Sequence, residues 1–235
     1  FIPAMGQKAR EEFANELCKA LLEEGRIVPG NFVYLTDIMY NPQIVSKAGV
    51  ILASHFQGMD LDYIVTVETK GIPLAYEVAK SLGIELVIIR KDNKVTEGST
   101  VTINYVSGTS GRIQQMALAK KCMKPSSKCV FIDDFLRGGG TAQGIKDLLS
   151  EFDSELVGTG VLVDNVGIQN KRTDEYVSII DLEYDKENNL SYWHQFLFYN
   201  RFFRNESSLT NHFPFKPNRT LPGRSLIPRY ITDDR

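Results

Sequence analysis

The sequence predicts an α/β protein with a mostly parallel central sheet and helices on both of its faces. Short apolar runs typical of buried strands alternate along the chain with segments whose apolar residues recur at helical spacing. One of these strands leads into an acidic pair, a glycine-rich loop and a helix, in that order. With 235 residues, 43% of them hydrophobic, the chain can enclose one such domain with a substantial core.

The helices are predicted from apolar residues that recur every three or four positions. In the first of them, Phe13, Leu17 and Leu21 stand among many Glu and Lys residues, which indicates an amphipathic helix. Pro42 fits the first position of the second helix. The predicted helices cover residues 4–24, 42–57, 72–82, 112–121 and 142–149.

The strands are predicted from short runs rich in β-branched, aromatic and other apolar residues. Between the third and fourth of them, residues 90–100 form a polar, glycine-containing excursion that we expect to leave the sheet. The predicted strands cover residues 32–37, 62–67, 85–89, 101–105, 130–132, 155–163 and 177–184.

The strongest functional signal is the stretch from Cys129 to Thr141. Asp133 and Asp134 follow the apolar run and cannot lie unpaired in a dry core, so we expect them at the carboxyl edge of the sheet. In the glycine loop Arg137–Thr141, backbone amides can turn toward an anion, and the next helix adds its positive end. Adjacent carboxylates suit a vicinal diol. The stretch therefore predicts a site for a ribose 5-phosphate.

A second loop is expected at the same sheet edge. Thr69, Lys70 and Gly71 follow the strand 62–67 and precede a helix, and a turn that presents amides beside a lysine is an anion site. This signal is weak alone, because a plain strand-to-helix turn is the more common explanation of such a segment. Together the two loops are expected to face one ligand.

Charge is unevenly distributed, although the net charge of the chain is only −2. Residues 90–128 hold eight Lys or Arg against two Asp or Glu, a net charge of +6. Such a block can serve a polyanionic small ligand or nucleic acid phosphates, or it can be a solvated face. The basic residues are Arg90, Lys91, Lys94, Arg112, Lys120, Lys121, Lys124 and Lys128.

Other classes of protein find no support in the composition. The sequence has no apolar run of membrane-spanning length and no signal peptide. Its three cysteines lack the spacing of metal ligands and indicate thiols of a reducing cytoplasm, and its three scattered histidines suggest neither a metal site nor a catalytic triad.

At Cys129–Thr141 the chain resembles the ribose-phosphate signature of type I phosphoribosyltransferases. The amino-acid sequences of residues 69–76, 90–101 and 103–108 further resemble the effector domain of the bacterial pur operon repressor family. That family joins an N-terminal winged helix, expected to be absent from this chain, to a phosphoribosyltransferase-like domain without catalytic activity. The resemblance implies binding of 5-phosphoribosyl pyrophosphate, competition by guanosine tetraphosphate, a homodimer, and operator DNA as partner of the complete protein.

The resemblance also implies roles for individual residues. Asp133 and Asp134 would bind the ribose hydroxyls, and Thr69, Lys70 and Gly71 would bind the pyrophosphate. The 5-phosphate would lie among Arg137, Gly138, Gly139, Gly140, Thr141 and Ala142. Tyr105 would join the ligand site from a flexible hood loop, which would carry Arg90, Lys91, Lys94 and Arg112 toward the ligand or DNA phosphates. No cofactor is obligatory and no residue is expected to be a metal ligand, although magnesium can accompany the bound pyrophosphate.

An enzymatic function remains an alternative to the regulatory function. A purine phosphoribosyltransferase, which makes nucleotide and pyrophosphate, would use the same ribose-phosphate features, and its chemistry depends mainly on positioning and charge stabilisation. We expect residues 1–184 to form the phosphoribosyltransferase-like domain, 185–203 a C-terminal hairpin, and 204–235 an irregular tail.

Overall fold

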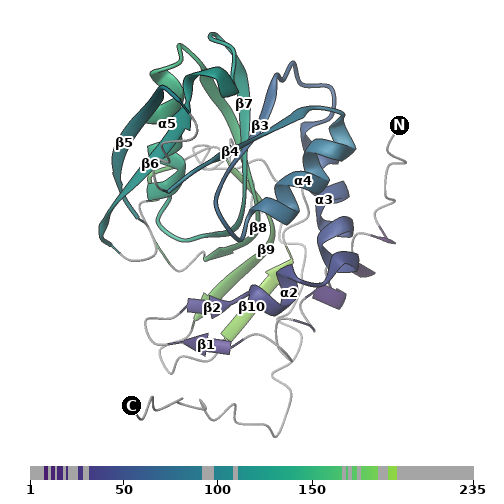
Figure 1. Ribbon diagram of the computed structural model, residues 1–235. Coiled ribbons are helices and arrows are strands. Elements are labelled where there is room, and N and C mark those ends of the chain that lie inside the picture. Colours follow the sequence, from purple (N-terminus) through teal and green to yellow (C-terminus); the bar gives the residue numbers. More distant parts are fainter. Residues whose placement is uncertain are drawn as a thin grey trace, which may run out of the picture. The chain divides into compact units, whose positions relative to one another are not determined.

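The protein has a six-stranded sheet as its centre, seen in a computed structural model (Figure 1). The strand order is β10-β9-β8-β7-β3-β4, and every neighbouring pair is parallel except β9 and β10. The strands are β3 (Tyr63–Val67), β4 (Glu85–Ile89), β7 (Lys128–Leu136), β8 (Glu155–Asn165), β9 (Tyr176–Tyr184) and β10 (Leu190–His194). The structure describes residues 8–9, 12–13, 15–17, 20, 26–28, 32–91, 98–107, 111–165, 168, 171–173, 176–184 and 190–194. The predicted fold class is confirmed.

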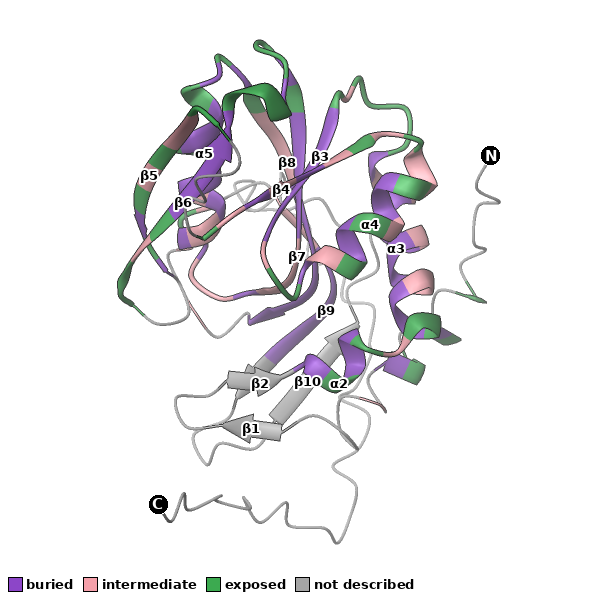
Figure 2. Ribbon diagram, in the orientation of Figure 1, coloured by how far each residue is buried: buried purple, intermediate pink, exposed green. Residues whose placement is uncertain are grey.

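Helices cover both faces of this sheet, as Figure 1 shows. On one face, α3 (Pro42–Phe56) and α4 (Ile72–Leu82) share a core with alternate strand residues such as Ile64, Val130 and Ile132. On the other face, α5 (Gly140–Ser150) packs on Val65, Phe131 and their neighbours. Figure 2 shows the buried residues gathered along the strands and the inner sides of the helices. The sheet is therefore buried on both faces, which explains its apolar runs.

Local signals account for the ends of these helices. The Asn41 side chain accepts hydrogen bonds from the backbone N–H groups of Gln43 and Ile44, so it caps α3 ahead of Pro42. Gly83, at φ 69°, ends α4 in the left-handed conformation that glycine adopts without steric cost. The predicted helices at 42–57 and 72–82 are confirmed.

The helix predicted over 112–121 is wrong. Residues Ile113–Ala119 form strand β6, which pairs antiparallel with β5 (Thr100–Val106), and only Lys120–Cys122 form a 3₁₀ turn, η2. Gln, Met, Leu and Ala favour helices, but pairing with β5 and burial of Met116 and Leu118 against α5 outweigh that preference. We call the β5–β6 hairpin the hood. Residues 92–97 and 108–110 lie outside the described residues.

The first strand is shorter than predicted. Strand β2 (Phe32–Tyr34) pairs antiparallel with β1 (Arg26–Val28), and helix α2 (Thr36–Met39) begins where residues 36–37 were expected to extend the strand. Asp37 lies in the first turn of α2, where the positive end of the helix stabilises a carboxylate. Of the helix predicted over 4–24, the described residues are helical, and Phe13 and Leu17 join the core beside α3.

Toward the C-terminal end of the chain, the structure describes one further strand of the sheet. Strand β10 pairs antiparallel with β9, from Leu190 opposite Tyr184 to His194 opposite Ile180, and lies within the range of the hairpin predicted over 185–203. The remainder of that predicted hairpin and the predicted irregular tail lie outside the described residues. Among the helices that the structure describes, none has the length and apolar character that a bilayer crossing needs.

Candidate functional site

The acidic pair lies within strand β7 and not after its end, which corrects the predicted boundary. Strand β3 pairs with β7 only as far as Phe131, whereas β8 continues to pair through Asp133 opposite Val161 and Leu136 opposite Asp164. On the β3 side, the sheet is therefore open beside Asp133 and Asp134. Both residues are half-buried at the carboxyl edge, as expected.

The loop after β3 occupies this opening. A Cβ atom on Gly71 would lie 2.6 Å from Oδ1 of Asp133 and 2.8 Å from Oγ1 of Thr66, so only glycine allows this approach. Thr69 and Lys70, which are exposed, precede it, and the peptide bond between Glu68 and Thr69 is cis. The predicted second loop thus lies directly against the acidic pair.

The two carboxyl groups influence each other's pKa. Burial raises the pKa of Asp133 well above its ordinary value, and the charge of Asp134 raises it further, while the Lys91 ammonium opposes both. Burial also raises the pKa of Asp134, but its hydrogen bond with the Asp133 carboxyl and the nearby Lys70 ammonium lower it. Lys70 and Lys91 therefore supply opposite charge to the acidic pair from two different loops.

The glycine loop ends at the start of α5. Gly139 precedes the helix at φ 70°, and no side chain caps the first turn, which begins at Gly140. The first backbone N–H groups of a helix lack partners within it, so this turn is suited to binding an anion. Arg137 and Thr141 flank these amides and are half-buried.

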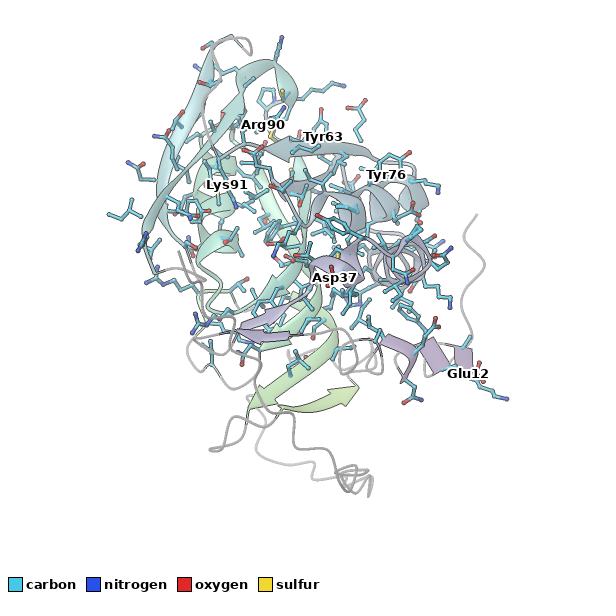
Figure 3. The ribbon with its side chains drawn as sticks, turned by 60° about the horizontal axis from the view of Figure 1, so that its bottom comes forward. Glu12, Asp37, Tyr63, Tyr76, Arg90 and Lys91 are labelled. Carbon is cyan, nitrogen blue, oxygen red and sulfur yellow. The ribbon has the colours of Figure 1, made fainter. Side chains whose placement is uncertain are left out.

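The hood is joined to the second loop through Glu68. The Glu68 carboxylate accepts a hydrogen bond from the Lys91 backbone N–H at 2.7 Å and from Nη1 of Arg90 at 3.2 Å. Figure 3 labels Arg90 and Lys91, which lie close together. Arg90 in turn exchanges two backbone hydrogen bonds with Ala117 of β6. One side chain therefore connects the loop 69–71 with the base of the hood.

Tyr105 of the hood packs over α5 and is buried, at 7% exposure. Its hydroxyl donates to Oε1 of Gln114 at 2.9 Å. Burial raises the pKa of Tyr105, the Asp133 charge adds to this, and a hydrogen bond with the Thr141 side chain opposes it. Tyr105 therefore interacts with both Asp133 of the acidic pair and Thr141 of the glycine loop.

Gly144 of α5 allows Tyr105 to pack so closely, and its replacement should show this. In Gly144→Ala, the new Cβ would lie 2.8 Å from Cβ of Tyr105 and 3.2 Å from Cε of Met116. Alanine favours a helix by about 1 kcal/mol over glycine, but overpacking costs about 1–3 kcal/mol. We expect a net loss of about 1 kcal/mol, measured by urea unfolding. Lys146→Ala, at an exposed position of α5, is the control and should be nearly neutral.

The remaining predicted residues are not all brought together. Arg112 is exposed at the start of β6, and Lys94 lies outside the described residues. In the part of the chain that the structure describes, no three His, Cys, Asp or Glu side chains form a group suited to a metal ion.

Sequence analysis missed several residues around the site. Glu68 precedes the second loop and had no predicted role, and Thr66 has a buried hydroxyl without a hydrogen-bond partner beside Gly71. A cluster of Asp164, Lys171 and Tyr176 lies beyond the glycine loop. The polar Asp164 near the end of an apolar strand was the one available signal.

The comparisons with known proteins agree with this arrangement. The model of the phosphoribosyl transferase domain family matches residues 35–195, well over half of the chain. The chain belongs to this family. The solved adenine phosphoribosyltransferase of Rhodothermus marinus has the same fold, with a TM-score of 0.63 at 23% identity over 73% of this chain and 99% of that one.

Within the phosphoribosyl transferase domain family, the chain is a member of the pur operon repressor group, as its sequence predicted. The purine biosynthesis transcriptional repressor PurR of Bacillus subtilis is 51% identical over 77% of this chain, which spans 64% of that protein. The purine biosynthesis transcriptional activator PurR of Lactococcus lactis is 37% identical over 78% of this chain and 68% of that protein. A xanthine phosphoribosyltransferase of Deinococcus deserti is 28% identical over 63% of this chain.

Proposed function

We propose that this chain is the effector-sensing part of a purine-biosynthesis transcriptional repressor and that it binds 5-phosphoribosyl pyrophosphate. The observation that carries the proposal is the close packing of Gly71 on Asp133, which brings the lysine-bearing loop 69–71 against the acidic pair of β7, the strand that leads through the glycine loop into α5. A ligand with a phosphate at each end of a ribose matches this order of groups.

Each part of the ligand has a matching group in the proposal. The 5-phosphate accepts hydrogen bonds from the amides of Gly139–Ala142, with Arg137 and Thr141 beside them. The ribose hydroxyls donate to Asp133 and Asp134, whose carboxylate oxygens accept most strongly when ionised. The pyrophosphate lies on the loop 69–71, between Lys70 and Lys91.

The regulatory role is proposed from the relatives. Two of them are named as purine biosynthesis transcriptional regulators, and the site retains exposed cations on and beside the hood that DNA phosphates could contact. Ligand phosphates would compete for the charge of Lys91 and thereby change DNA affinity of the complete protein. We further propose that the chain works in the cytoplasm as a homodimer without catalytic activity, and that guanosine tetraphosphate competes for the same site.

Calorimetric titration tests the proposal. We expect 5-phosphoribosyl pyrophosphate, added with magnesium, to bind the wild type and to bind Asp134→Ala at least tenfold more weakly. Asp147→Ala, at an exposed position of α5, is the matched control and should bind normally. Guanosine tetraphosphate should displace the ligand. A wild type that does not bind would overturn the proposal.

The same samples distinguish a sensor from an enzyme. Each purine base is added to protein and ligand, and nucleotide and pyrophosphate are measured. We expect neither product. Formation of nucleotide from any base would show a purine phosphoribosyltransferase, the reaction class of the Deinococcus deserti relative.

A further inference from the structure

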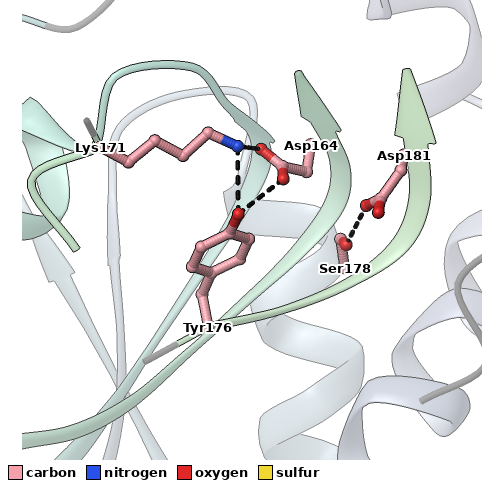
Figure 4. A network of polar contacts seen from close by, with 5 residues as sticks. All are labelled: Asp164, Lys171, Tyr176, Ser178 and Asp181. Carbon is pink, nitrogen blue, oxygen red and sulfur yellow. Dashed lines mark hydrogen bonds and ion pairs between the residues drawn. The ribbon is translucent and has the colours of Figure 1, made fainter. Parts of the chain in front are cut away.

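A buried cluster of Asp164, Lys171 and Tyr176 lies beside the glycine loop (Figure 4). The Lys171 ammonium forms an ion pair with Oδ1 of Asp164 and donates to the Tyr176 hydroxyl at 3.1 Å. The Tyr176 hydroxyl donates to Oδ2 of Asp164 at 2.7 Å, which closes a ring of three side chains. Only 6% of the Lys171 side chain and none of the Asp164 side chain is exposed.

The cluster is connected to the glycine loop through the backbone on either side. Asp164 of β8 pairs with Leu136, the residue before Arg137, where the loop begins. After Lys171, the backbone N–H of Arg172 donates to the Gly138 carbonyl at 3.1 Å. A Cβ atom on Gly139 would lie 3.0 Å from the backbone nitrogens of Arg172 and Thr173. Residues 172–173 therefore contact the loop at the two glycines that precede α5.

A buried ion pair needs a reason other than stability, because apolar side chains of similar volume are often at least as stabilising in its place. Its distinctive property is fixed geometry, since three hydrogen-bonded groups allow one arrangement only. Lys171 has a long and otherwise flexible side chain, and the backbone that follows it, at residues 172–173, contacts the glycine loop. The cluster can therefore fix the position of the backbone at residues 172–173 relative to Gly138 and Gly139.

We propose that Lys171 is a positioning residue for phosphate binding. Held by Asp164 and Tyr176, it fixes residues 171–173 against the glycine loop, and this orients the amides of Gly139–Ala142 before any ligand arrives. Preorganised amides bind an anion without having to reorder. The inference rests on the proposed function for the identity of the ligand, although the positioning of the loop can be measured without one.

The decisive variant is the double change Asp164→Leu with Lys171→Met, which removes both charges and keeps the volume. We expect its thermal midpoint to stay close to that of the wild type. Hydrogen exchange over residues 137–142 should become at least fivefold faster in the absence of ligand. Affinity for ribose 5-phosphate should fall about tenfold, while affinity for pyrophosphate, bound at the loop 69–71, stays unchanged. Tyr176→Phe, which breaks the ring but retains the ion pair, should give a smaller change in the same direction.

Failure of this inference is distinguishable from failure of the proposed function. A wild type that binds neither ribose 5-phosphate nor 5-phosphoribosyl pyrophosphate overturns the function, and the exchange measurement then decides the positioning role alone. Unchanged exchange over 137–142 in the double variant overturns the positioning role. Equal losses of ribose 5-phosphate and pyrophosphate affinity also overturn it, because they would indicate a general structural role.

Discussion

Asp133→Asn is expected to make the ligand-free protein more stable at neutral pH while it weakens ligand binding. In the wild type, burial and the neighbouring Asp134 charge raise the pKa of Asp133, so ionising this carboxyl opposes folding. Asparagine is neutral, can still donate to Asp134, and can still accept the Asp134 backbone N–H through Oδ1, as Asp133 does at 2.9 Å. A gain of about 0.5–2 kcal/mol is typical of such functional-site changes.

The pH dependence of stability explains why Asp133→Asn is expected to be more stable and not less. Since the pKa of Asp133 is raised on folding, the folded state binds its proton more tightly than the unfolded state, and the wild type loses stability as pH rises through the raised pKa. Asparagine does not ionise, so Asp133→Asn does not lose stability in this way as the pH rises. Urea unfolding at several pH values should therefore give a variant advantage at pH 7 that disappears toward the ordinary pKa of aspartate, about 3.9. Asp147→Asn, at an exposed position of α5, should show no such dependence. A difference in unfolding free energy between Asp133→Asn and the wild type that is the same at every pH would contradict the explanation.

Ligand binding by Asp133→Asn should fall about 10–100-fold, because a hydrogen bond to a charged acceptor contributes about 1.5–3 kcal/mol. The combination matters: a variant that is more stable but binds the ligand more weakly cannot owe its defect to misfolding. Calorimetry with 5-phosphoribosyl pyrophosphate measures the loss, and full binding by the variant would remove Asp133 from the site.

Gly71→Ala has the second large expected effect, and it is destabilising. The backbone at Gly71 has φ −69° and ψ −17°, which alanine adopts freely, so any cost must come from contact. The new Cβ would lie 2.6 Å from Oδ1 of Asp133 on β7 and 2.8 Å from Oγ1 of Thr66 on β3, two neighbouring strands of the central sheet that cannot easily move apart. We expect a loss of about 2–3 kcal/mol in the free energy of unfolding and a loss of pyrophosphate binding.

Gly83→Ala is the control for Gly71→Ala, because it separates backbone strain from contact. Gly83 has φ +69°, but a Cβ there would meet no atom within 4 Å. Its replacement should cost about 1 kcal/mol through the left-handed conformation alone and leave ligand affinity unchanged. Comparable effects of the two substitutions on ligand binding would mean that the contact between Gly71 and Asp133 has no functional role.

Local patterns account for what could be predicted from the sequence. The apolar runs around Val65 and Phe131 are buried on both faces, and their carboxyl ends meet at one edge, as parallel strands must. The two loops could therefore be assigned to one site before the contact between Gly71 and Asp133 was known. The glycine at position 139 also has the positive φ expected of a phosphate loop.

Pairings between distant segments account for what could not be predicted. Residues 113–119 have the composition of a helix, and only the partner β5 makes them a strand. Strand β7 extends through its acidic pair because β8 remains beside it, which nothing in residues 128–136 indicates. The hydrogen bonds from Arg90 and Lys91 to Glu68 span more than twenty residues, and side-chain partners at that distance leave no periodic signal.

The link through Glu68 has a thermodynamic consequence. Because one carboxylate accepts hydrogen bonds from both residues at the base of the hood, the energy of holding the hood and the energy of occupying the loop 69–71 are not independent. Such coupling is reciprocal: if the ligand changes the affinity of a macromolecule for the hood by some factor, that macromolecule changes the affinity of the ligand by the same factor. Under the proposed function, the affinity of the ligand would therefore differ between the free protein and the DNA-bound protein.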